Sequence, residues 1–149
     1  MSPSSVATTS ADESWAVDTS VAVAALDQSH EAHAVCRAAV LKHRPALAGH
    51  AAFETLAVLT RLPGNLRVDP ATALQLIIDV FPDHCWLDAR RQAALLRRLG
   101  SLGLAGGSVY DALVATAAHS NGRRLLSRDS RAERVYQLIG VDHQWVGPR

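Results

Sequence analysis

Short apolar runs alternate along this chain with longer segments whose apolar residues recur at helical spacing. Consecutive apolar residues predict strands covered on both faces, whereas recurrence every three or four residues predicts helices. The predicted strands are 15–17, 45–48, 84–87, 124–127 and 141–146, and the predicted helices are 20–26, 30–44, 50–62, 70–80, 88–99, 108–121 and 131–139. Strands that alternate with helices indicate an α/β domain in three α/β/α layers, with a mainly parallel central sheet and the last strand at its edge.

Length and composition indicate how many domains the chain forms and where they begin and end. A chain of 149 residues is most simply one domain, which we expect to span 14–149. Residues 1–13 are polar and lack both the basic start and the apolar core of a secretory signal, so we expect a disordered tail. No apolar run approaches the ~18 residues of a membrane span. Cys36 and Cys85 fit no metal or redox spacing, which favours buried free thiols and a cytoplasmic location.

Four acids lie where the surrounding sequence does not otherwise favour charge. Asp18 follows the first predicted strand and Asp129 follows the strand 124–127. Glu54 and Asp111 are the only acids of the helices that contain them. Ligands of open α/β folds bind at the carboxyl ends of the parallel strands, so we expect these carboxylates to meet at that edge.

Each of these acids also has a purely structural explanation. Asp18 could cap the helix that follows it, although Thr19 and Ser20 are adequate caps themselves. Asp129 could cap the last helix, although the segment 130–133 has the form of a capping box and would leave Asp129 free.

The two acids inside helices have structural alternatives as well. Ser108 and Asp111 have capping-box spacing, and Glu54 could form a salt bridge with Arg61. One hypothesis nevertheless covers all four acids. Carboxylates gathered in one place repel each other unless a cation lies between them, and oxygen ligands suit Mg²⁺ or Mn²⁺. Such a site activates water and stabilises the leaving oxygen in phosphodiester cleavage.

At this point four motifs resemble a known family, the PIN-domain ribonucleases, and within it the toxins of VapBC toxin–antitoxin modules. The motifs are VDTS at 17–20, ETLAVLTRLP at 54–63, YDAL at 110–113 and LLSRD at 125–129. The resemblance extends over nearly all of 14–147, in order, and implies a PIN-like nuclease domain.

The resemblance implies roles for particular residues. Asp18, Glu54, Asp111 and Asp129 would be the acidic quartet that binds one or two Mg²⁺ or Mn²⁺ ions and performs catalysis. Ser127 occupies the place where the family often has a Thr or Ser beside the last acid. The family cleaves single-stranded or looped RNA endonucleolytically, often tRNA or rRNA, is inhibited by a cognate VapB-type antitoxin and commonly forms homodimers.

Charge is distributed unevenly along the chain. The net charge is +1, yet 88–134 hold nine Arg against four acids. Arg124, Arg128 and Arg131 are therefore candidates for binding RNA phosphates. The three tryptophans lie at or in predicted strands, which favours packing in the core or sheet over base stacking.

Two other functions remain open. A receiver-like signalling domain also gathers acids around Mg²⁺ at strand ends, but this chain lacks paired acids near its first strand and a Lys after a late strand. An inactive PIN-fold module for binding or signalling is the second alternative. RNA cleavage excludes the former, and metal-independent RNA binding without cleavage identifies the latter.

Overall fold

The computed structural model describes residues 14–149, so the predicted tail 1–13 lies outside the described residues. Five strands form one sheet in the order β3-β2-β1-β4-β5. They are β1 (Trp15–Val17), β2 (Ala46–Ala48), β3 (His84–Cys85), β4 (Arg124–Ser127) and β5 (His143–Trp145). All four strand pairings are parallel and β5 is an edge strand, which confirms the predicted sheet.

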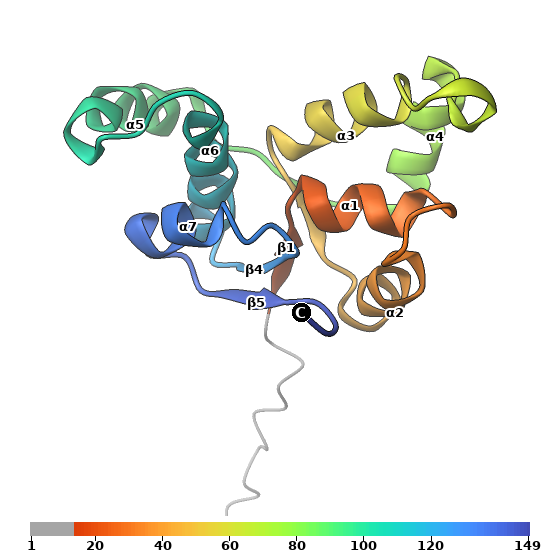
Figure 1. Ribbon diagram of the computed structural model, residues 1–149. Helices are drawn as coiled ribbons and strands as arrows, with labels where there is room; N and C mark the ends of the chain where they lie inside the picture. Colours follow the sequence, from red (N-terminus) through yellow and green to blue (C-terminus); the bar gives the residue numbers. More distant parts are fainter. Residues whose placement is uncertain (1–13) are drawn as a thin grey trace, which may run out of the picture.

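Helices cover both faces of this sheet. They are α1 (Thr19–Leu26), α2 (His33–His43), α3 (Ala51–Leu59), α4 (Pro70–Val80), α5 (Ala89–Leu102), α6 (Gly107–Ser120) and α7 (Glu133–Ile139), and a short 3₁₀ turn occupies Gly64–Leu66. Figure 1 shows α1 to α4 on one side and α5 to α7 on the other, which gives the predicted α/β/α layers. Parallel strands of one sheet are joined by right-handed crossover connections, which commonly contain helices that pack on a face of the sheet.

The two central strands hold the middle of the core. Val17 of β1 is paired with Leu126 of β4, and both side chains are almost completely buried. Burying one such side chain contributes about 1.5–3 kcal/mol. Because both strands run in the same direction, the residues that follow them, from Asp18 after β1 and from Arg128 after β4, emerge at one edge of the sheet.

Some element boundaries differ from the prediction for local reasons. The α2 helix begins at His33 rather than residue 30, because the His30 ring accepts a hydrogen bond from the Ala32 amide and forms a turn. The α3 helix ends at Leu59, where the Thr60 hydroxyl donates to the Leu56 carbonyl. Hydrogen bonds of this kind from serine or threonine compete with the helical ladder.

Predictions for single side chains had mixed outcomes. Cys36 and Cys85 are buried free cysteines, as expected. Trp15 is in the core, but Trp86 is 52% exposed, so its predicted packing in the core or sheet is wrong. The reason is that β3 ends at Cys85, one residue before this tryptophan. Within 14–149, no helix has the length and apolarity needed to cross a membrane.

Candidate active site

Asp18 is the innermost acid of the sheet edge. Its amide donates to the Leu126 carbonyl at 3.2 Å, which extends the pairing of β1 with β4 by one residue. Its carboxylate Oδ1 accepts from the Val21 amide at 3.2 Å and from the Ser20 hydroxyl at 2.6 Å. Asp18 is therefore the N-cap of α1, which is the structural role that the sequence left open for it, and Thr19 and Ser20 are not the cap.

Tyr136 of α7 holds the other oxygen of Asp18. The phenol donates to Oδ2 at 2.7 Å, and both side chains are buried. Burial raises the pKa of Asp18, while hydrogen bonds from Ser127, Ser20 and Tyr136 act in the opposite direction without cancelling the effect. Burial and the Asp18 charge likewise raise the pKa of Tyr136. Sequence reasoning missed this tyrosine because one hydroxyl on the buried side of a short amphipathic helix carries no recognisable signal.

Glu54 reaches the same edge from α3. The Thr19 hydroxyl donates to its Oε1 at 3.1 Å, so its observed partner lies in α1. Arg61, the predicted alternative partner, lies beyond the end of α3 at Leu59 and is no longer on the same helical stripe. The motif residue Thr19 thus orients the second acid, and Ser20 orients the first.

Asp111 lies within α6, one turn from its start. The cap of this helix is Gly106, and the Ser108 hydroxyl donates to the Ala105 carbonyl, so the capping-box alternative is wrong. The pKa of Asp111 is raised to about 6 by partial burial and then by the charges of Asp129, Glu54 and Asp18. These contributions show that the four carboxylates interact electrostatically.

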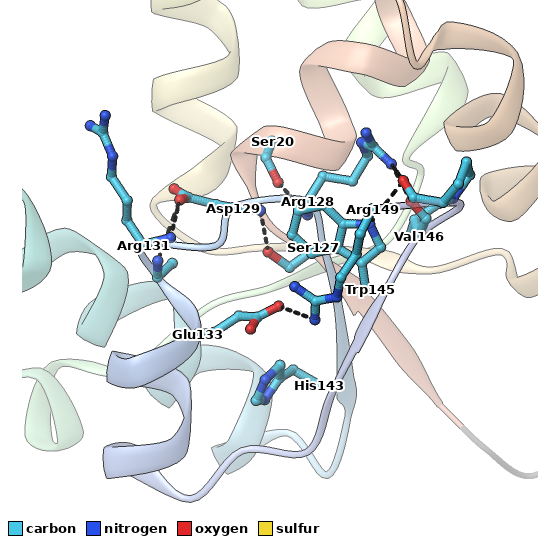
Figure 2. Close-up of polar contacts among 12 residues, drawn as sticks. Ser20, Ser127, Arg128, Asp129, Arg131, Glu133, His143, Trp145, Val146 and Arg149 are labelled. Carbon is cyan, nitrogen blue, oxygen red and sulfur yellow. Dashed lines mark hydrogen bonds and ion pairs between the residues drawn. The ribbon is translucent and has the colours of Figure 1, made fainter.

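Asp129 organises the turn that leads from β4 into α7. Its Oδ1 accepts from the amides of Arg131 at 3.0 Å and Ala132 at 3.3 Å, and its own amide donates to the Ser127 hydroxyl at 3.0 Å (Figure 2). The predicted capping box is absent, because Glu133 pairs with Arg149 at 2.8 Å. Asp129 consequently both stabilises this turn and lines the candidate site.

These four acids line one hollow of about 480 Å³. The structure therefore brings the predicted quartet together at the carboxyl edge of the sheet. Ser127 lies beside it, completely buried. His30 and Glu31, from the turn between α1 and α2, also line the hollow; sequence reasoning had not placed them here.

The donor set of this hollow fits a hard divalent cation. It offers carboxylate oxygens, and the pKa of Asp111 is raised by partial burial and then by the like charges of its three neighbours, which a cation would neutralise. As the side chains stand, no three His, Cys, Asp or Glu groups within 14–149 are grouped closely enough to hold a metal ion. An ion bound in this hollow would therefore require the carboxylates to turn toward a common point.

The three candidate arginines occupy different places. Arg128 lines the acidic hollow, but its Nη1 donates to the carbonyls of Val146 at 2.5 Å and Pro148 at 3.2 Å (Figure 2). Arg131 is exposed, and its side chain extends past Asp129 in the same view. Arg124 stands at the opposite end of β4, with its guanidinium over the Trp15 ring, so the structure does not bring it to the hollow.

Comparison with known proteins adds an independent finding. The PIN domain family matches residues 16–138. The chain is 45% identical over 126 residues to Ribonuclease VapC27 of Mycobacterium tuberculosis, which covers 85% of this chain and 92% of that protein. It is 39% identical over 133 residues to Ribonuclease VapC40 of the same organism, covering 88% and 98% respectively.

Proposed function

This chain belongs to the PIN domain family and is of the VapC type, and from this premise we propose that it is a metal-dependent endoribonuclease, the toxin of a type II toxin–antitoxin pair. One structural observation carries the proposal. Four carboxylates from α3, α6 and the ends of β1 and β4 line a single hollow, and partial burial together with the charges of the other three raises the pKa of Asp111. Several carboxylates gathered in one hollow are typical of a site that binds a divalent cation.

Asp18, Asp111 and Asp129 would hold Mg²⁺ or Mn²⁺, with Glu54 completing the set. A bound ion would polarise a phosphate oxygen and lower the pKa of the attacking water. The chain contributes positioning: Asp18 is held by donors on both oxygens, and Glu54 is held by Thr19. In-line attack on phosphorus would break the bond to the 3′ oxygen and leave a 5′-phosphate and a 3′-hydroxyl.

Neighbouring groups would bind the RNA backbone. The Ser127 hydroxyl donates to the Asp18 carboxylate and accepts from the Asp129 amide, and it would contribute to catalysis by orienting water or phosphate beside these acids. Arg131, which is exposed, and Arg128, at the rim, would contact phosphates near the cleaved bond. Arg124 would contact only RNA that continues toward the opposite end of β4.

Nuclease assays on single-stranded and structured RNA, with Mg²⁺ or Mn²⁺, test this proposal. Asp18→Asn and Asp111→Asn should each reduce the cleavage rate by at least about 100-fold. Asp83→Asn, an exposed acid far from the hollow, is the matched control and should retain activity. Activity that survives the loss of either acid, with the fold intact by circular dichroism, would contradict the assignment of that acid.

The proposed partners follow from the family. VapC-type proteins are named for modules in which a VapB-type antitoxin is the inhibitor, and we expect such a partner to cover the acidic hollow of this chain. Addition of the product of a neighbouring antitoxin reading frame should abolish cleavage. Sedimentation velocity of the purified chain tests the proposed homodimer.

A further inference from the structure

Four aromatic rings form a partly exposed cluster beside the acidic hollow. The rings of His50 and Tyr110 are stacked, with centroids 4.7 Å apart and planes 10° apart. Phe53 lies 6.4 Å from His50 and 5.9 Å from Trp86. Phe53, Trp86 and Tyr110 are 62%, 52% and 49% exposed, so a large part of each ring faces solvent. Exposed apolar patches of this kind indicate binding surfaces.

Part of this cluster encloses a separate hollow of about 340 Å³. His50, Phe53 and Trp86 contribute rings to its wall, and Leu87, Leu113 and Ala117 contribute apolar side chains. Gly49 and Gln92 complete the lining. The described lining residues include no Asp, Glu, Lys or Arg, so the hollow suits a flat, uncharged group rather than a phosphate.

The rings are tied to the acids through the same helices. Phe53 immediately precedes Glu54 in α3, and Tyr110 immediately precedes Asp111 in α6. Successive helical residues are separated by about 100° of rotation, so each ring occupies the face next to its acid. The stack of His50 on Tyr110 therefore joins the two helices that supply Glu54 and Asp111.

We propose that this aromatic hollow binds an unpaired nucleobase of the RNA whose phosphate lies at the acidic hollow. The inference rests on the proposed ribonuclease function and adds to it a requirement for an unstacked base beside the cleaved bond. Every base has a π face that stacks on aromatic side chains, and such stacking is independent of sequence. The adjacency of Phe53 to Glu54 and of Tyr110 to Asp111, together with the lack of charged lining, favours a base over other occupants.

Equilibrium binding in the presence of EDTA tests the inference without cleavage. The probes are a labelled oligoadenylate of about ten nucleotides and an abasic oligomer of the same length, which keeps the phosphates but lacks the bases. Trp86→Leu and Phe53→Leu should each weaken oligoadenylate binding about tenfold and leave abasic binding unchanged. Trp86→Phe should restore most of the affinity, because it restores a ring. Leu41→Ala, at an exposed residue outside the hollow, should change neither affinity.

Several outcomes would overturn the inference. An equal loss of affinity for both probes would mean a general effect on the fold or backbone contacts, and no loss for either would mean that the rings do not contact RNA. A wild-type dimer that becomes monomeric in Trp86→Leu, measured by sedimentation, would assign the surface to a second copy of the chain.

The inference and the proposed function can fail separately. If the protein cleaves RNA with metal but its RNA affinity is unchanged by the ring substitutions, the base site is excluded and the proposed nuclease function stands. If RNA affinity depends on the rings but no RNA is cleaved, the proposed nuclease function is excluded and the base site stands.

Discussion

Removing the charge of Asp111 should stabilise the metal-free protein. The carboxylate is half-buried and faces three other acids, which together with burial raise its pKa from 3.8 to about 6. A rise of this size corresponds to at most about 3 kcal/mol of destabilisation at neutral pH, and solvent screening of a half-exposed group reduces it to about 1–2 kcal/mol. Asp111→Asn removes the charge and keeps the shape of the side chain, so this free energy should be recovered.

The dependence on pH follows from the direction of the shift. Because the folded state binds the Asp111 proton more tightly than the unfolded state, the wild type gains stability as pH falls from about 6 toward 3.8. The asparagine variant has no proton to bind at this position. Its advantage should therefore be full above the folded pKa and should disappear as the pH approaches 3.8.

Urea unfolding in EDTA at several pH values measures this difference. Asp83→Asn, which removes an exposed acid from the same chain, corrects for the change in net charge. Saturating Mg²⁺ should reduce or reverse the advantage, since a bound cation neutralises the repulsion only when the ligand set is complete. A variant that is no more stable than the wild type at pH 8, or whose advantage is the same at pH 4, would refute the electrostatic argument.

Three further substitutions test individual contacts. Tyr136→Phe should lower the free energy of unfolding by about 1.5–3 kcal/mol in chemical unfolding, because it removes the donor to a buried carboxylate. The same variant should bind Mn²⁺ about tenfold or more weakly in calorimetry, because Asp18 loses its orientation. Thr55→Val should stabilise the protein by about 1 kcal/mol, since the buried Thr55 hydroxyl has no hydrogen-bond partner among the described residues; a lower melting temperature would reveal a bond to water or ligand. Gly49→Ala should cost about 1–2 kcal/mol, because φ is +48° and a Cβ would lie 3.2 Å from the Cβ of Ala117; unchanged stability would mean that this turn relaxes at no cost.

Much of the architecture was predictable from local patterns. The strands 15–17 and 124–127 were predicted with the observed limits, because consecutive apolar residues there are bounded by acids and turn residues. The helix at 70–80 was predicted because Asp69 and Pro70 form a strong start signal, and the Asp69 carboxylate does accept from the Thr72 amide. Signals of this kind act over a few residues and so survive in any fold.

Local patterns failed where a residue satisfied two requirements at once. Capping and a site role were treated as alternatives for Asp18, and Asp129 was interpreted as free of capping, yet both acids hold local turns and also line the acidic hollow. Trp86 was assigned to packing because it lies within the predicted strand 84–87, yet the observed strand ends before it and the ring is exposed. A capping motif or an apolar run shows what a residue is able to do, and packing decides which possibility is realised.

By itself, the sequence determined the order of strands and helices along the chain, and it placed Asp18 directly after β1 and Asp129 two residues after the end of β4. Parallel pairing then required Asp18 and Asp129 to meet at one edge, because strands that run the same way have their carboxyl ends together. Only the tertiary structure decided which atoms hold these acids: the Tyr136 phenol reaches Asp18 across 118 residues of chain. Such contacts depend on how whole helices pack, and the side chains that form them carry no local signal of the partner they will meet.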